Sequence, residues 1–179
     1  METPDAGRRR DARLTIRDAT AIATDLLHRE CRYLDTRAWD AWLALYAPDA
    51  VYWVPAWRDE HTQTSDPDTE ISQIFHDSRR GLEERVMRVR SGKSVTAQPL
   101  PRTTHFVSNV EARFDADGAI AAEASWMVQV YQPRSERQHA NFGRYELRLA
   151  ESARGWVITR KLIRLQNDCV PALVDFYLL

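Results

Sequence analysis

The segment from Tyr33 to Trp57 constrains the fold most, because it joins an aromatic helix face to a strand through a proline turn. Four large side chains recur there at the i, i+3, i+4, i+7 spacing of one helix face: Trp39, Trp42, Leu43 and Tyr46. Pro48 and Asp49 are expected to end this helix, since the residue before a proline is disfavoured in the α region. Residues 50–54, Ala-Val-Tyr-Trp-Val, have the composition of a strand. The segment therefore predicts a helix whose aromatic face is covered by a sheet.

A long helix is expected before this segment. Thr15 and Asp18 have the spacing of a capping box, which marks a helix start. The apolar residues that follow trace one helix face: Ala19, Ile22, Ala23, Leu26, Leu27, Tyr33 and Leu34. Asp35 and Thr36 are both favoured N-cap types, so they predict a break and the start of the aromatic helix.

The middle of the chain predicts a loop, a short strand and a third helix. Residues 58–70 are polar and indicate a long surface loop. Residues 71–75 fit a strand or a helical turn about equally, and we choose the strand. Residues 81–90 predict a charged amphipathic helix, in which Glu84 and Arg88 have the spacing of an ion pair. Its apolar side carries Leu82, Val86 and Val89.

From Thr103 onward the apolar pattern changes to the period of two that is typical of strands. The first strand alternates through Phe106, Ser108, Val110, Ala112 and Phe114. The second alternates through Ala122, Ala124, Trp126, Val128 and Val130, and the third through Tyr145, Leu147 and Leu149. Residues 115–118, 132–137 and 151–155 predict the turns between them. Residues 156–165 are apolar on both faces, which predicts a strand covered on both sides.

Helices followed by a meander of strands indicate an α+β fold, in which a curved antiparallel sheet wraps around the N-terminal helices. A chain of 179 residues fits one domain, which we place at residues 14–179 after a frayed tail at 1–13. Arg8 to Arg10 in that tail could meet an acidic partner, although a solvated terminus is favoured.

Charge and cysteine content favour a cytoplasmic protein that binds neither nucleic acid nor a membrane. The net charge is -1, and no apolar run approaches the length of a membrane span. The first thirteen residues lack the apolar segment of a secretory signal. Cys31 and Cys169 show no CxxC spacing, so free thiols in a reducing compartment are expected.

Motifs for cofactor chemistry are missing from the sequence. The five histidines are scattered singly: His28, His61, His76, His105 and His139. No Cys-x-His or Cys-x-x-His pair occurs, so neither a Rieske cluster nor a mononuclear iron site is expected in this chain. The six glycines form no GxGxxG, no phosphate-binding loop and no G-x-S-x-G elbow. We therefore expect no catalytic, cofactor-binding or metal residues in this chain.

A pocket inside the cone of sheet and helices would be the remaining route to catalysis. The candidates for a general acid or base there are Asp25, Asp40, Tyr52 and His105. Ordinary structural roles are favoured for them: His105 as a hydrogen-bonded sheet residue, Asp40 as a solvent-side charge and Tyr52 as core. No spacing forces any two of them to converge.

Six tryptophans are more than a core of this size requires, so part of the aromatic surface could lie in a subunit interface. Trp39, Trp42 and Trp126 are expected in the core, whereas Trp57 fits core and interface equally well. Four arginines could likewise meet a partner's acids or remain solvated: Arg85, Arg88, Arg90 and Arg102.

Several blocks of the sequence resemble the small (beta) subunit of aromatic-ring-hydroxylating dioxygenases, most closely the benzoate and anthranilate branch. They are HRECRYLDTRAWDAWLALYAPDAVYWVPAW at 28–57, DPDTEISQIFHDSRRGLEERVMRVRSG at 66–92, RTTHFVSNVEA at 102–112 and KLIRLQNDCVPALVDFYLL at 161–179. Residues 119–138 show little match, which leaves the substrate open among benzoate, anthranilate, salicylate and halobenzoates.

The resemblance implies a nuclear-transport-factor-2-like (NTF2-like), or cystatin-like, cone and an assembly of three large and three small subunits. It implies that the large (alpha) subunit holds a Rieske [2Fe-2S] cluster and a mononuclear Fe(II), with electrons from NADH passed through a reductase. The small subunit would then mainly hold the assembly together.

Two other functions remain open on the sequence. The first is a stand-alone isomerase or dehydratase with an Asp or His in the cone, because fold does not determine function. The second is a ligand-binding module, which would need an open apolar cavity that the crowded aromatic face argues against.

Overall fold

The computed structural model describes residues 15–92, 99–167 and 174–179. The expected tail at 1–13 and Cys169 lie outside these residues. The chain runs through α1 (Ile16–Asp35), α2 (Trp39–Leu43), β1 (Tyr46–Pro55), β2 (Ser72–His76) and α3 (Arg79–Arg90). It continues through β3 (Arg102–Phe114), β4 (Ile120–Gln132), β5 (Arg137–Ser152), β6 (Gly155–Leu165) and the 3₁₀ turn η1 (Phe176–Leu178). Among the described helices, none is long and apolar enough to cross a membrane.

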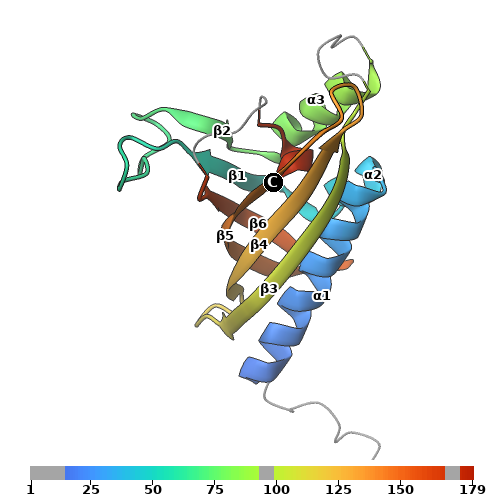
Figure 1. The fold of residues 1–179 in the computed structure, drawn as a ribbon. Helices are drawn as coiled ribbons and strands as arrows, with labels where there is room; N and C mark the ends of the chain where they lie inside the picture. Colours follow the sequence, from blue (N-terminus) through green and yellow to red (C-terminus); the bar gives the residue numbers. More distant parts are fainter. Residues whose placement is uncertain (1–14, 93–98, 168–173) are drawn as a thin grey trace, which may run out of the picture.

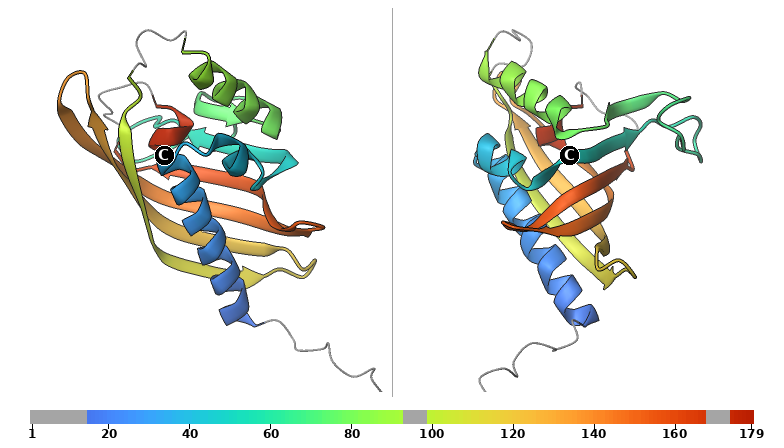
Figure 2. Two further views of the ribbon diagram at one scale, coloured as in Figure 1. Left: turned by 90° about the vertical axis from the view of Figure 1, so that its right-hand side faces the viewer. Right: turned by 180° about the vertical axis from the view of Figure 1, so that it is seen from behind.

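The strands form one curved sheet in the order β2-β1-β6-β5-β4-β3 (Figure 1). Helix α1 lies across its concave side, and α3 lies above β1 and β2 (Figure 2). The predicted α+β, NTF2-like cone is therefore confirmed. The sheet was expected to be antiparallel throughout, but β1 runs parallel to β6. Every other neighbouring pair of strands in this sheet is antiparallel.

Helix α1 begins as the sequence predicts. The Thr15 amide donates to the Asp18 carboxylate at 2.7 Å, and the Asp18 amide donates to Thr15 Oγ1 at 3.3 Å, which completes the capping box. The predicted apolar face is buried at Ala19, Ala23, Leu26, Leu27 and Leu34. Cys31 is a buried free thiol on this helix, and burial raises its pKa to about 12.

The aromatic helix is shorter than its periodicity predicts. Helix α2 ends at Leu43, and Tyr46 already belongs to β1, so the prediction that Pro48 ends the helix is wrong. Pro48 lies where the ladder between β1 and β6 is interrupted, between Tyr46 and Val51, so its missing N–H removes no ladder bond there.

The predicted N-cap at Asp35 and Thr36 is also wrong. Thr36 is the C-cap of α1, with its hydroxyl donating to the Arg32 carbonyl at 2.7 Å. Helix α2 begins after Ala38, whose side chain makes no capping bond. The chain turns between the two helices at Arg37, which has φ of 58°. Asp35 is therefore free to bond across to β3.

The loop at 58–70, the strand choice at 71–75 and the third helix agree with the structure. Leu82 and Val86 are buried on α3, and Val89 packs against the core. The ion pair observed for Glu84 is with Arg80 at 3.2 Å rather than with Arg88. Glu84 thus pairs toward the N-terminus of the helix instead of toward its C-terminus.

Strand β3 changes face at a bulge that the alternation did not reveal. Its pairing with β4 shifts between Ser108 and Glu111, and Asn109 has φ of 53°. Ala112 therefore faces the core as expected, whereas Phe106, on the other side of the bulge, is 52% exposed. His105 takes the inward position in place of Phe106. The predicted alternation is right after the bulge and wrong before it.

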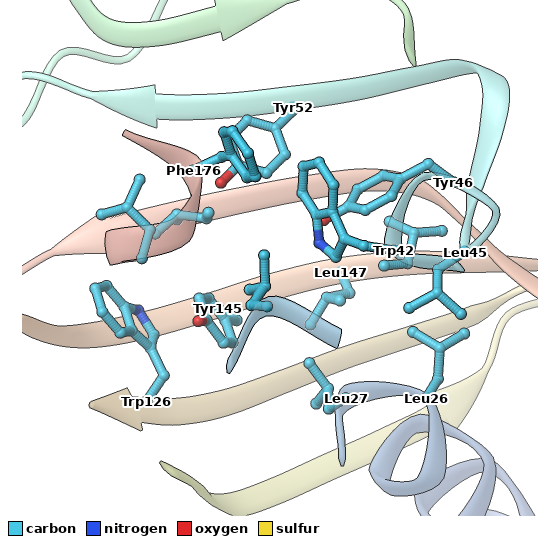
Figure 3. Packing of buried hydrophobic residues seen from close by; sticks show 14 of the residues in the cluster. Leu26, Leu27, Trp42, Leu45, Tyr46, Tyr52, Trp126, Tyr145, Leu147 and Phe176 are labelled. Carbon is cyan, nitrogen blue, oxygen red and sulfur yellow. The ribbon is translucent and has the colours of Figure 1, made fainter. Parts of the chain in front are cut away.

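The concave side is filled with aromatic side chains from distant parts of the chain (Figure 3). Phe176 stacks on Trp42 with ring centroids 4.6 Å apart and meets Trp39 edge-on at 5.3 Å. Trp126 stacks on Tyr145 at 5.2 Å. The core placement of Trp39, Trp42 and Trp126 is confirmed, and the C-terminal turn η1 completes this packing.

Candidate functional site

The most unusual group inside the cone is a buried ion pair between Glu30 of α1 and Lys161 of β6. Lys161 Nζ donates to both Glu30 carboxylate oxygens at 2.8 Å, and each side chain is only 1% exposed. Charges this deeply buried are stable only when they are paired and hydrogen-bonded. The pair therefore ties the helix to the strand at the centre of the core.

Further donors complete the coordination of Glu30. The Tyr46 hydroxyl and Trp42 Nε1 both donate to Glu30 Oε1, the latter at 3.4 Å. Lys161 Nζ also lies 3.9 Å from the centroid of the Tyr145 ring, in cation–π geometry. Burial, followed by the Glu30 charge, raises the pKa of Tyr46 well above its ordinary value, so its hydroxyl remains a donor. The carboxylate and the ammonium thus neutralise each other.

A second polar group links the end of α1 to β3. His105 Nδ1 lies 2.6 Å from Asp35 Oδ1, and the His105 amide and Thr103 hydroxyl donate to the same carboxylate at 3.0 and 2.9 Å. Burial alone would raise the pKa of Asp35, but these hydrogen bonds outweigh it and hold the pKa below its ordinary value. His105 Nε2 is buried and bonds to none of the described residues.

We expect Asp35→Asn to lower the free energy of unfolding at pH 7 by about 1–3 kcal/mol, because three donors lose a charged acceptor. The folded pKa of Asp35 lies below its unfolded value of about 3.9, so this stabilisation is present above that pH and is lost as the pH falls through the folded pKa. Denaturant unfolding between pH 7 and pH 3 measures the effect. The difference from wild type should shrink below about pH 4.

Asp25→Asn is the matched control for this measurement, because Asp25 is 70% exposed and, among the described residues, forms an ion pair with Arg29 alone, on the same helix. It should change stability by about 0.5 kcal/mol or less at every pH. Equal losses for the two variants, or a loss at position 35 that persists unchanged to pH 3, would contradict the role given to Asp35.

The four predicted candidates do not form one site. Asp25 and Asp40 lie on the surface and pair with Arg29 and Arg90, at 3.0 and 2.7 Å. Tyr52 is buried beside Tyr46, and burial raises its pKa well above the ordinary value. His105 is the hydrogen-bonded sheet residue that was expected, and its partner is Asp35.

Sequence reasoning missed Glu30, Lys161 and Asp35. Glu30 interrupts the apolar face of α1, between Leu27 and Leu34, and Lys161 is a charged residue among the buried positions of β6, next to Leu162 and Ile163. A charged residue on each of two buried surfaces is the signal that could have paired them. Asp35 carried no such signal, because its type and position also fit a helix cap.

The convex side of the sheet carries a hollow of about 400 Å³ beneath the loop that follows β1. Trp53, Arg160 and Leu162 lie on its floor, and residues 61–65 line it from the loop. Arg164 on the same floor is held by Glu146 at 2.5 Å and by the Gln63 side-chain oxygen at 3.3 Å. Trp57, for which core and interface were both open, donates its ring N–H to the Leu165 carbonyl at 2.9 Å at the edge of this hollow.

The described residues contain no cluster of side chains suited to hold a metal ion. Within 15–92, 99–167 and 174–179, no three His, Cys, Asp or Glu side chains converge as ligands. Glu30 and Asp35 are already bonded to Lys161 and His105. The described histidines, cysteines and acidic residues therefore do not fit a Rieske cluster or a mononuclear iron site, because each of these needs several free ligands at one point.

The fold and the sequence together identify the protein family to which this chain belongs. The ring hydroxylating beta subunit profile matches residues 29–172, so the chain belongs to this family. It is 37% identical to the toluate 1,2-dioxygenase subunit beta of Pseudomonas putida, over 86% of this chain and 93% of the relative. It is 38% identical to the 2-halobenzoate 1,2-dioxygenase small subunit of Burkholderia cepacia, over 84% and 90%.

A solved structure agrees with this assignment. The beta subunit of the benzoate 1,2-dioxygenase from Burkholderia mallei superposes with a TM-score of 0.74 and 31% identity, covering 93% of this chain and 98% of that one. The predicted family is therefore confirmed, and this chain is a beta subunit of an aromatic-ring-hydroxylating dioxygenase, an oxidoreductase that works as a complex.

Proposed function

We propose that this chain is the structural, non-catalytic beta subunit of a Rieske non-haem iron dioxygenase that acts on an aromatic carboxylate. Its alpha subunits would hold the [2Fe-2S] cluster and the mononuclear Fe(II) and would receive electrons from NADH through a reductase. The assembly would contain three alpha and three beta subunits in the cytoplasm. Residues 14–179 would act as one domain, and no residue of this chain would be catalytic.

The observation that supports this proposal is that the interior of the cone is filled and its charges are paired. Enzymes of this shape would need an accessible acid or base there, yet Glu30 and Lys161 are each 1% exposed and bonded to each other. Phe176 stacks on Trp42 and fills the space beside them. A cone filled in this way is suited to presenting its outer surface to partner subunits.

The substrate class follows from the relatives. The names of the toluate, 2-halobenzoate, anthranilate and benzoate dioxygenases share one chemistry, a carboxylate on an aromatic ring. A chain 34–38% identical to these four would serve an enzyme of the same class.

We expect the chain purified alone to behave differently from the chain bound to its alpha subunit. The chain purified alone should be colourless, free of iron and inactive, because its described acids and histidines form no metal site. Co-expression with the alpha subunit encoded beside it should give a complex that contains iron and absorbs visible light. With reductase and NADH, that complex should hydroxylate benzoate or a substituted benzoate. Iron assay, absorption spectra and oxygen uptake measure these outcomes.

The alternative, a stand-alone isomerase or dehydratase, rests on the buried pair of His105 and Asp35. It predicts turnover of a small carbonyl substrate by the isolated chain and loss of that turnover in His105→Asn. Such turnover, together with failure to co-purify with any iron protein, would refute the structural role.

A further inference from the structure

A chain of hydrogen bonds joins the edge strand β2 to the C-terminal turn η1 through one side chain of α3. Arg85 Nε donates to His76 Nε2 on β2 at 2.8 Å, and Arg85 Nη1 donates to Asp175 Oδ1 at 2.8 Å. Asp175 Oδ1 also accepts from the Phe176 amide at 2.9 Å, so it caps η1. Figure 2 shows η1 beneath α3. Arg85 therefore bridges β2 and the turn that completes the aromatic packing.

The turn η1 has few other polar attachments to the part of the chain that the structure describes. Asn141 Nδ2 donates to the Leu178 carbonyl at 3.0 Å, and the Leu178 amide donates to the Asp175 carbonyl at 2.8 Å within the turn. The side chains of Arg85 and Asp175 are 17% and 18% exposed, so solvent screens their ion pair less than it screens a surface pair. Weakening the Arg85 bridge is therefore expected to loosen η1.

The bond from Arg85 defines the protonation state of His76. A histidine nitrogen accepts a hydrogen bond only when it carries no proton, so the ring is neutral in this arrangement. A proton on Nε2 would place its N–H against the N–H of Arg85, and two cations would then be in contact. The ring has little room to turn away, because α3 lies against it at Gly81, where an added Cβ would clash with His76 Nδ1. Uptake of a proton therefore displaces Arg85.

Charged and titratable groups from several elements surround His76. They come from α3, from the directly opposite position of β1, from the residue before η1 and from the residue after β2: Arg85, Glu84, Tyr52, Asp175 and Asp77. Burial and then the Arg85 charge lower the pKa of His76 below its ordinary value, although the three acids act in the opposite direction. The folded chain thus protonates His76 less readily than the unfolded chain does. The stability that neutral His76 contributes is complete above about pH 6.5 and is lost as the pH falls toward the folded pKa.

We propose that His76, Arg85 and Asp175 form a C-terminal latch that loosens the turn η1 when the protein is acidified. Neutral His76 holds the Arg85 guanidinium in the position where it meets Asp175. When His76 takes up a proton from solvent, the guanidinium loses this acceptor, moves away from the new cation and no longer fixes Asp175. The turn then opens more often from the tryptophan rings that Phe176 covers. The C-terminal latch does not depend on the proposed function, because all of its groups belong to this chain.

Hydrogen exchange of the full chain, followed by NMR, measures this opening at the Leu178 amide, which bonds to the Asp175 carbonyl. After correction for the intrinsic effect of pH on exchange, the opening constant should rise by about threefold or more between pH 7.5 and pH 5.5, because protonation favours the state in which His76 is free. The Val128 amide, in the middle of β4, should have a much smaller opening constant at both pH values. That difference would show that the turn opens without global unfolding.

His76→Gln tests whether this histidine is the group that responds to pH. Glutamine can still accept a bond from Arg85, but it carries no charge at either pH. The Leu178 opening constant of His76→Gln should stay within about twofold of the wild type at pH 7.5 and should not rise at pH 5.5. His139→Gln is the matched control, because His139 is also half-buried and burial also lowers its pKa, although it lies on β5. It should keep the pH dependence of the wild type.

Arg85→Met tests the bridge itself, because it removes the contacts to both His76 and Asp175. The Leu178 opening constant should rise about tenfold at pH 7.5, since Asp175 loses a charge-assisted bond, and it should no longer depend on pH. Arg88→Met, which alters an exposed arginine on the same helix, should leave the opening constant unchanged. Where Arg85→Met does not fold, His76→Gln still decides the question.

Three results would overturn the inference. The first is an opening constant of the wild type that stays the same, or rises equally in His76→Gln, between pH 7.5 and pH 5.5. The second is an opening constant that falls on acidification, which would show that Asp175 pairs with the protonated His76 and tightens the turn. The third is an equal opening constant at Leu178 and Val128, which would show that the turn opens only when the whole domain unfolds.

Discussion

Lys161→Met is expected to lower the free energy of unfolding by about 3–5 kcal/mol, which is a large part of the stability of a typical domain. The substitution leaves the Glu30 carboxylate, 1% exposed, without its counter-charge in the core. Denaturant unfolding monitored by circular dichroism measures the loss. Arg154→Met, in the exposed turn between β5 and β6, is the control and should change stability by about 0.5 kcal/mol or less.

Removing both charges distinguishes the contribution of the ion pair from that of the groups bonded around it. Glu30→Leu combined with Lys161→Met should recover most of the loss, because it removes both buried charges together. The recovery should stop short of wild type by about 1–3 kcal/mol, since Tyr46 and Trp42 lose their acceptor. A Lys161→Met protein within 1 kcal/mol of wild type would show that the ion pair is not what holds α1 to β6.

Phe176→Ala should cost about 3–5 kcal/mol, as expected for an aromatic residue removed from a packed core. Phe176 is fully buried and contacts three aromatic rings, of Trp39, Trp42 and Tyr177. Unfolding in urea measures the stability, and near-ultraviolet circular dichroism should lose intensity as the tryptophans gain freedom.

Phe176→Leu is the control for this substitution, because it keeps most of the apolar volume and loses only the ring contacts. It should cost about 1–2 kcal/mol. If alanine costs no more than leucine, the C-terminal turn does not fill the cone, and an open cavity for a ligand would regain support.

The features predicted correctly from the sequence are those set by local chemistry. The capping box at Thr15 and Asp18 is complete within four residues, and the alternation of β4 reflects one strand with one buried face. The fold class follows from the order of such elements. The short helix at Trp39 shows the limit, because the same spacing continues through Tyr46 although the backbone has already become a strand.

The features that were missed depend on contacts between distant segments. The bulge at Asn109 has no glycine to mark it, so the exchange of Phe106 for His105 is seen only in the pairing with β4. In the sequence, Glu30 and Lys161 are two charged residues far apart, and only the fold places them together. The family resemblance indicated the role of the chain, whereas its residues alone left an enzyme open.

The distance along the chain between Glu30 and Lys161 has a consequence for biosynthesis. The two residues are 131 positions apart, and the parallel neighbour of β1 is the last strand of the sheet. As the polypeptide leaves the ribosome, α1 emerges with a carboxylate on its apolar face and cannot be buried stably until β6 follows. We expect the nascent chain to remain open until most of it has been synthesised, and then to close cooperatively and slowly, as topologies rich in non-local contacts do.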